Sequence, residues 1–194
     1  MDIDKAIRTR RSIRSYKADP VPQKVLAEIM ETSSWAASGM NVQPWEFAII
    51  GGEKMKEYKA LLDKKVAANA PPELEFPSRF ELPEPFSSRA AQYRETSMGY
   101  QFPPGTEGVE EKKRAYFTRA GRVYDAPNAI IVYMEKELID MPWQFVSIGM
   151  IAQTICLAAL DHGLGTCIMG RPVAWPNMVR ELLGIPANKS IALA

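Results

Sequence analysis

The chain has 194 residues, of which 46% are hydrophobic and 24% are charged. This balance suits one globular domain and excludes a disordered tail, a collagen and a coiled coil. The 24 basic and 23 acidic residues give a formal net charge of +1, so a general electrostatic attraction to nucleic acid or to anionic membranes is not expected. Two cysteines and one histidine argue against a disulfide framework, a metal site and a Ser-His-Asp triad.

The sequence favours a cytoplasmic protein. The first five residues lack the apolar stretch of a signal peptide. The most apolar stretch, residues 145–160, is interrupted by polar side chains and is shorter than the ~20 residues that a membrane span needs. The two cysteines suit a reducing compartment.

The first third of the chain alternates between helical and extended patterns. Asp2 or Asp4 can cap a short first helix. Apolar residues at helical spacing predict helices over 23–34 and 53–69. A short apolar run predicts a strand over 45–50, after a loop of small and polar residues.

Residues 71–108 are too long for a plain connection, and they are rich in proline and aromatic residues. Helical pieces are expected at 87–94 and, beyond this segment, at 110–123. The aromatic set either lines a substrate lid or forms the underside of a loop. Its members are Phe76, Phe80, Phe86, Tyr93, Tyr100 and Phe102.

The last third again alternates strands and helices. Residues 143–161 are apolar nearly all round, so we expect a helix that is buried on most sides. His162 should lie at its C-terminal end. The other expected elements are a strand over 128–134, a buried strand over 164–169, a helix over 176–183 capped by Gly184, and a strand over 190–194. This order favours an α/β or α+β domain with a small central sheet wrapped by helices. Because the chain stops inside the last strand, we expect a C-terminal segment to be missing.

The first motif is the basic segment, which consists of Arg10, Arg11, Ser12, Ile13 and Arg14. In an extended chain Arg10, Ser12 and Arg14 point to one side. Guanidinium groups bind phosphate in bidentate fashion, and a serine hydroxyl adds a hydrogen bond. The alternative is a solvated basic patch.

The second motif is the amide loop, residues 38–43, which is followed by Pro44 and Trp45. Asn41 and Gln43 each offer a donor and an acceptor, which suits the edge of a heterocycle, and Gly39 allows close approach of the backbone. The alternative is a turn that precedes a buried tryptophan.

The third motif is the glycine segment, residues 163–170, in which an apolar run leads to Gly170. Backbone amides there can face a ligand, although a tight helix-to-strand turn would use the same residues. Cys167 fits a buried structural thiol better than a nucleophile, because no histidine is placed to activate it.

In their order and spacing these motifs resemble those of the FMN-dependent nitroreductase family. The basic segment resembles its Arg-x-Ser-x-Arg/Lys motif, and residues 38–45 resemble its Ser-x-x-Asn-x-Gln-Pro-Trp motif. Leu164-Gly165-Thr166 with Gly170, and Leu183-Gly184-Ile185-Pro186 before the last strand, match as well. The resemblance covers nearly all of the chain and is weakest over residues 64–122.

The resemblance implies an α+β fold of the nitroreductase type, with a mostly antiparallel sheet wrapped by helices in an intertwined homodimer. One FMN would lie at each of two interface sites, and the apolar helix 143–161 would form much of the dimer core. A single domain would span residues 1–194, with a lid at about 71–108 and a missing C-terminal arm that embraces the partner.

The resemblance also assigns residue roles. The basic segment would hold the phosphate and ribityl chain, with Arg14 near the N1 and C2=O edge of the flavin, and the amide loop would come from the partner subunit. The expected FMN-binding residues are Arg10, Arg11, Ser12, Arg14, Ala37, Ser38, Gly39, Asn41, Gln43, Ile168, Met169 and Gly170. The expected substrate contacts are Tyr93, Tyr100 and Phe102. No side chain is required as a catalytic group, because the flavin does the chemistry.

The implied function is an NAD(P)H-dependent oxidoreductase that reduces nitroaromatics, quinones or similar electron-poor compounds by ping-pong hydride transfer. The small aromatic acceptor would bind in the homodimer, with no nucleic acid, membrane or metal involved. The alternatives are a dehalogenase or enone reductase of the same fold, and a flavin-binding or redox-sensing protein without turnover.

Overall fold

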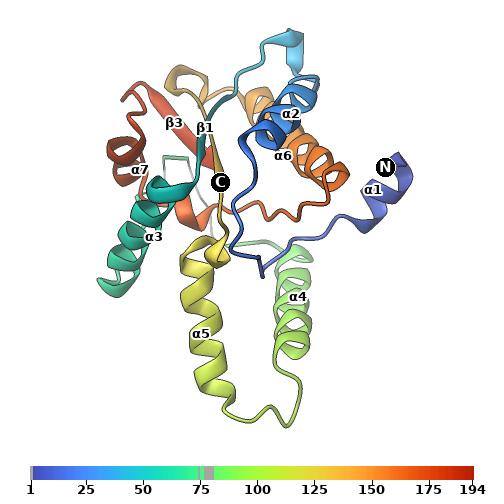
Figure 1. The fold of residues 1–194 in the computed structure, drawn as a ribbon, viewed down its shortest axis with the longest axis vertical. Coiled ribbons are helices and arrows are strands. Elements are labelled where there is room, and N and C mark those ends of the chain that lie inside the picture. The colour runs from blue at the N-terminus through green and yellow to red at the C-terminus, as the bar shows by residue number, and fades with distance from the viewer. Residues whose placement is uncertain (1, 74, 77–80) are drawn as a thin grey trace.

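A three-stranded antiparallel sheet forms the centre of the chain (Figure 1). The computed structural model describes residues 2–73, 75–76 and 81–194. The strands are β1 (Glu46–Ile50), β2 (Ala129–Glu135) and β3 (Lys189–Leu193), in the order β1-β2-β3. Glu46 lies opposite Tyr133, and the register of β2 against β3 shifts between Val132 and Tyr133. The sheet confirms three of the expected strands and the antiparallel α+β architecture.

Seven α-helices in the described part of the chain surround or extend from this sheet (Figure 1). They are α1 (Ile3–Thr9), α2 (Gln23–Ser33), α3 (Gly52–Ala67), α4 (Phe86–Gln101), α5 (Val109–Gly121), α6 (Pro142–Asp161) and α7 (Pro176–Leu183). Short 3-10 turns add Gly39–Asn41, Val123–Asp125, Lys136–Leu138 and Arg171–Val173. A helix is present at each expected position, although α4 is longer than expected, and His162 is the C-cap of α6 and Gly184, in the left-handed region, the C-cap of α7.

One core cluster packs α3 and α7 against the sheet. Tyr58, Leu62 and Val179 are fully buried there against Ile131 of β2. The Tyr58 hydroxyl donates to the backbone oxygen of Pro172 at 2.9 Å, so its polar end is satisfied inside the core. This contact fixes the turn Arg171–Val173 to α3.

A second core cluster packs α2 and α6 against the sheet. Ile29 of α2 and Ile151 of α6 meet Val132 and Met134 of β2. The expectation that α6 is buried on most sides is wrong for the single chain, because an apolar stripe faces outward. Trp143 is 74% exposed, Val146 45% and Met150 41%. A helix that is apolar all round therefore covers the sheet with one face only.

The helix that contains the apolar stretch is also longer than the stretch itself, residues 145–160. With its 20 residues, α6 is long and apolar enough to cross a membrane by length and composition, but 44% of its most apolar window is buried inside the fold. The buried side of α6 packs against α2 and β2.

The glycine segment does not form the expected buried strand. It makes one isolated parallel bridge, between Thr166 and Ser12, and Met169 exchanges backbone hydrogen bonds with Ala194 at 2.7 and 2.9 Å. Its residues from 164 to 169 are half-buried or exposed. The segment runs between the basic segment and the end of β3, so too few of its backbone groups meet a neighbouring strand to build a ladder.

Helices α4 and α5 form an arm that projects from the body of the molecule (Figure 1). Although α4 has 16 residues, twice the length expected at 87–94, none of them is buried. A helix without a buried face has no apolar period, so its full length leaves no signal in the sequence. Phe80, one of the expected lid aromatics, lies outside the described residues.

The outer side of β3 is covered by side chain and backbone from other segments. Glu75 accepts a hydrogen bond from the backbone N–H of Ile191 at 2.9 Å, and Met169 pairs with Ala194. Glu75 also forms an ion pair with Arg180 of α7, in which both side chains are 11% exposed. The start of the 71–108 segment is therefore anchored to the sheet.

Candidate active site

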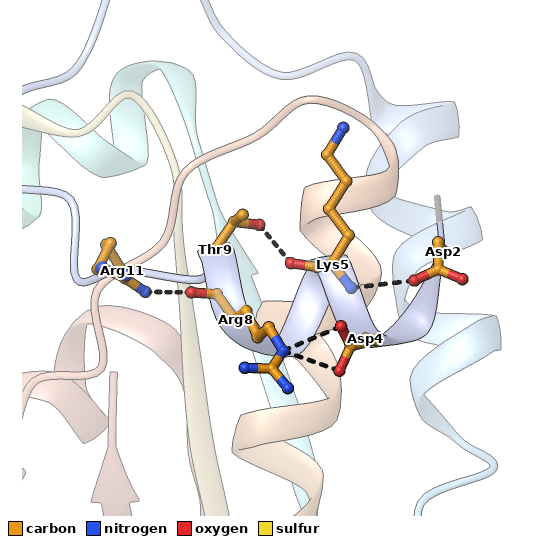
Figure 2. Close-up of polar contacts among 6 residues, drawn as sticks. All are labelled: Asp2, Asp4, Lys5, Arg8, Thr9 and Arg11. Carbon is orange, nitrogen blue, oxygen red and sulfur yellow. Dashed lines mark hydrogen bonds and ion pairs between the residues drawn. The ribbon is translucent and has the colours of Figure 1, made fainter.

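The basic segment leaves α1, a short helix held by local polar contacts (Figure 2). Asp2 caps its start by accepting from the backbone N–H of Lys5 at 3.1 Å, and Arg8 pairs with Asp4 at 2.9 Å. At the other end the guanidinium of Arg11 donates to the backbone oxygen of Arg8 at 2.7 Å (Figure 2) and to that of Arg10 at 2.8 Å. The side chain of Arg11 thus satisfies carbonyl groups that the helix end leaves open.

The side chain of Arg14 is held by a residue of the arm formed by α4 and α5. Its Nη2 donates to the hydroxyl of Tyr93 in α4 at 2.8 Å. Partial burial lowers the pKa of Arg14, but the neighbouring Tyr93 hydroxyl and Cys167 thiol outweigh this effect and raise the pKa overall. Arg14 is therefore a permanently charged group held between the N-terminal segment and the arm.

The basic segment and the glycine segment meet. The backbone N–H of Ile13 donates to the oxygen of Thr166 at 2.9 Å. A Cβ at Gly165 would lie 2.7 Å from Cγ1 of Ile13, so only glycine allows this approach. Beyond it, Ile168 is 45% exposed, and nothing lies within 4 Å of where a Cβ on Gly170 would be. The structure thus brings Arg10, Ser12 and Arg14 near Thr166 and Cys167 of the glycine segment.

Cys167 of the glycine segment lies close to Ser12 and Arg14 of the basic segment. Burial raises the pKa of its thiol, against the opposing effects of Arg14 and of a hydrogen bond with Ser12. The thiol is therefore protonated at neutral pH and is half-buried rather than fully buried as expected. A protonated thiol does not support nucleophilic chemistry.

The amide loop has a strained backbone. Met40, Asn41 and Gln43 have φ values of 52°, 56° and 48°, in the left-handed region. The hydroxyl of Ser38 accepts from the backbone N–H of Gln43 at 3.0 Å and closes the loop. The side chains of Ala37, Asn41 and Gln43 are all exposed. Residues held in this region of the backbone cluster at ligand sites and turns.

Within one chain the amide loop does not meet the basic segment. The loop touches the start of α6, where the N–H of Gly39 lies 3.4 Å from the hydroxyl of Ser147. The basic segment pairs with Thr166, beyond the other end of α6 at Asp161. At 1.5 Å per residue, Ser147 and Asp161 are about 20 Å apart along α6.

Of the three expected substrate contacts, only Tyr93 reaches this site. Tyr100 is 85% exposed on the last turn of α4. The ring of Phe102 lies 5.9 Å from that of Tyr116 in an edge-to-face contact and holds the end of the arm together.

The left-handed turn at Val123–Asp125 is not predicted by any residue pattern. Val123, Tyr124 and Asp125 have φ values of 53°, 54° and 60°, and β-branched residues rarely adopt this region. The turn buries Tyr124 with its hydroxyl 3.4 Å from that of Tyr116. Burial and this hydroxyl raise the pKa of Tyr124 to about 12, so it remains a neutral group beside Arg14.

A cavity of about 520 Å³ lies next to the basic segment. Ile13, Tyr16 and Cys156 contribute to its mostly apolar lining, together with the glycine segment. The described residues contain no cluster of three metal-ligating side chains.

The comparisons with known proteins agree with this geometry. The family model "Nitroreductase family" matches residues 7–194. The nitrobenzene nitroreductase of Ectopseudomonas oleovorans is 31% identical over 97% of this chain and 82% of its own length. The 4-nitrobenzoate reductase of Nocardioides is 28% identical over 97% of this chain and 76% of its own length.

Solved structures share the fold. NfnB from Mycobacterium smegmatis, described as an FMN-dependent nitroreductase in complex with NADPH, has a TM-score of 0.85 at 22% identity. It aligns over 98% of this chain and 83% of that one. NfnB from a Sphigopyxis strain has a TM-score of 0.86 at 24% identity, over 100% and 86%. With the family model matched over nearly the whole sequence, the chain belongs to the nitroreductase family.

Proposed function

We propose that the chain is an FMN-dependent oxidoreductase that uses NADH or NADPH to reduce nitroaromatics, quinones or similar electron-poor acceptors. The observation that carries this proposal is the meeting of the basic segment with the glycine segment at Ser12 and Thr166, with Arg14 fixed beside them. The names of the relatives, which are nitrobenzene and 4-nitrobenzoate reductases, support it.

The residues present fit FMN. Arg10 and Ser12 are half-buried in the segment that follows α1, where their donors suit a phosphate and a hydroxylated chain. Open space above Gly170 and Gly39 lets a planar ring approach the backbone at both places. Bound FMN would supply a carrier that takes up hydride from NAD(P)H and passes electrons to the acceptor. We assign its binding to the twelve residues named from the sequence.

The protein's own contribution is charge and position. Arg14, whose pKa is raised and whose guanidinium is held by Tyr93, stabilises negative charge that develops next to it. Arg11 holds the end of α1 and so fixes the direction in which the basic segment leaves the helix. The arm with Tyr93 forms part of a lid over about 71–108, which we propose sets substrate choice.

A homodimer completes the site. Within one chain the amide loop contacts Ser147 near the start of α6, whereas the basic segment pairs with Thr166, and no hydrogen bond among the described residues joins the two segments. An isologous dimer with antiparallel α6 helices brings each loop to the partner's basic segment. The outward apolar residues that such an interface would bury are Trp35, Met40, Trp143, Val146 and Met150.

We also propose that the protein is cytoplasmic and forms a single domain. Cys156 is buried and Cys167 half-buried, and both are free thiols, as suits a reducing compartment. The sheet, both core clusters and the anchored start of the lid form one continuous body.

The test is an anaerobic absorption spectrum of the purified protein with FMN, before and after adding NADPH or NADH. A bound-flavin spectrum that bleaches supports an oxidoreductase, and a panel of nitroarenes, quinones, halogenated phenols and enones then separates a nitroreductase from a dehalogenase or enone reductase. A bound flavin that neither donor bleaches supports the sensor. A protein that binds no flavin contradicts the proposal.

A further inference from the structure

A second cavity is lined in part by Gly170, the last residue of the glycine segment. Its volume is about 450 Å³, within the range of roughly 300–1,000 Å³ of small-molecule sites. Its described lining consists of Ala70, Pro72, Glu75, Phe76, Gly170, Arg171, Val173, Ala174, Trp175, Ile191 and Ala192. It is therefore an apolar space that begins at the backbone to which we assign FMN.

The walls of this cavity are held by hydrogen bonds. The backbone N–H of Glu73 donates to the oxygen of Ala174 at 2.7 Å, and the indole N–H of Trp175 donates to the oxygen of Pro71 at 2.9 Å. The contact of Tyr58 with Pro172 fixes the turn that follows Gly170. The cavity is thus formed before any ligand enters, which lowers the entropic cost of binding.

Two charged side chains, Glu75 and Arg171, line the cavity in its described part. Only Glu75 has an ion-pair partner among the described residues. Glu75 pairs with Arg180 and accepts from the N–H of Ile191, so its charge is already matched. Arg171 is exposed and has no ion-pair partner among the described residues. An apolar cavity next to Gly170 therefore carries one unmatched cation at its edge.

We infer that Arg171 binds a carboxylate on the ring of an aromatic acceptor, so that the enzyme prefers nitrobenzoates to uncharged nitroarenes. The inference rests on the proposed function and names its substrate class. The apolar lining takes the ring, and the planar guanidinium pairs with the carboxylate in bidentate fashion. Because Arg171 follows Gly170 directly, a ring held by it lies near the backbone assigned to the flavin.

An anion could also come from the phosphates of NAD(P)H. The cavity favours the carboxylate, because its described lining offers one cation and an apolar wall rather than the several donors that a pyrophosphate needs. The two sources differ in which kinetic constant depends on Arg171: the KM of the acceptor or the KM of the donor.

The experiment compares Arg171→Gln with wild type on 4-nitrobenzoate and nitrobenzene, each with NADPH at saturation, and also measures the KM of NADPH. Binding of benzoate, which is not reduced, is followed by calorimetry as a readout independent of turnover. Lys136→Gln removes one exposed positive charge elsewhere and serves as the control. Arg171→Lys tests whether charge alone is enough.

We expect Arg171→Gln to lower kcat/KM for 4-nitrobenzoate about tenfold and to weaken benzoate binding to a similar degree. Nitrobenzene kinetics, the KM of NADPH and the control should stay within twofold, and Arg171→Lys should retain part of the preference. Equal effects on both acceptors, or a change confined to the KM of NADPH, would overturn the inference while leaving the proposed function standing. Absence of turnover with both acceptors in the wild-type protein would instead contradict the proposed function. In that case calorimetry still tests the carboxylate site, because unchanged benzoate binding in Arg171→Gln would reject it.

Discussion

The hydroxyl of Tyr93 lies 2.8 Å from Nη2 of Arg14, although 79 residues separate them in the chain. Tyr93 belongs to the exposed helix α4, and Arg14 belongs to the basic segment. This hydrogen bond joins the projecting arm to the charged centre of the candidate site. The position of the arm and the orientation of Arg14 are therefore coupled.

Replacing Tyr93 should reveal this coupling. Tyr93→Phe keeps the ring and removes the hydroxyl, so Arg14 loses a fixed partner, and we expect kcat/KM with a nitroarene to fall about fivefold. The effect is modest because the Tyr93 side chain is 56% exposed. Tyr100→Phe, on the same helix but 85% exposed, is the matched control. Equal kinetics for the two variants would refute the coupling.

Glycine is required at position 165. Gly165→Ala would place a methyl group 2.7 Å from Ile13, and we expect a loss of about 1–3 kcal/mol in the free energy of unfolding. Ile13→Ala in the same chain should recover part of that loss. At Gly99 in α4 nothing lies within 4 Å of the added carbon, so Gly99→Ala should stabilise by about 0.5–1 kcal/mol. Urea denaturation measures all three, and an equal effect at both glycines would contradict the proposed contact.

The exposed stripe of α6 should control association. Met150→Glu puts a charge in the proposed dimer interface, and we expect a monomer that also loses FMN, because each site then lacks the partner's amide loop. Light scattering and flavin absorbance measure the two losses together. Tyr100→Glu places the same charge on the exposed arm and should leave both unchanged. A dimer that persists in Met150→Glu would argue for a different interface.

The buried ion pair of Glu75 and Arg180 should matter more than surface pairs. Glu75→Gln leaves Arg180, 11% exposed, with an unmatched charge, and we expect a loss of about 3 kcal/mol in the free energy of unfolding. Glu53→Gln breaks the exposed pair with Lys56 and should change stability by less than about 1 kcal/mol. Similar unfolding curves for the two variants would show that the anchor of the lid is weak.

Alkaline pH should destabilise the fold through its buried tyrosines. The pKa of Tyr124 is raised to about 12 by burial and by the Tyr116 hydroxyl. Because the folded state holds this proton more tightly than the unfolded chain, its contribution is fully present below about pH 10 and is lost as the pH rises toward 12. Tyr124→Phe should therefore show a shallower loss of Tm between pH 10 and 12. An unchanged slope would contradict the raised pKa.

The elements that could be predicted from the sequence are those that bury a regular face. The period of α3 and the apolar runs of β1 and β2 predict their positions to within a residue or two, since burial itself creates the pattern. The buried strand predicted over residues 164–169 is wrong, because an apolar run also suits an extended connection that is held by one bridge at Thr166. Helix α4 was under-predicted because it has no buried residue.

Some parts of the candidate site could also be predicted from the sequence, and others could not. The basic segment and the glycine segment could be paired in advance, because both motifs are local and resemble a known family. The contacts of Arg14 with Tyr93 and the left-handed turn at Tyr124 could not, because they depend on tertiary placement and on backbone strain. Arg11 closing the end of α1 was also not foreseen, since the motif alone indicates an anion ligand.

The cover on the outer side of β3 has a consequence for solubility. A bare edge strand offers a row of free N–H and C=O groups to any other extended chain. Here the carboxylate of Glu75 occupies the N–H of Ile191, and Met169 occupies both backbone groups of Ala194. Since a charged side chain and a short irregular segment occupy that edge, a foreign strand finds no free register there, and the sheet is protected from growing outward from β3 into aggregates.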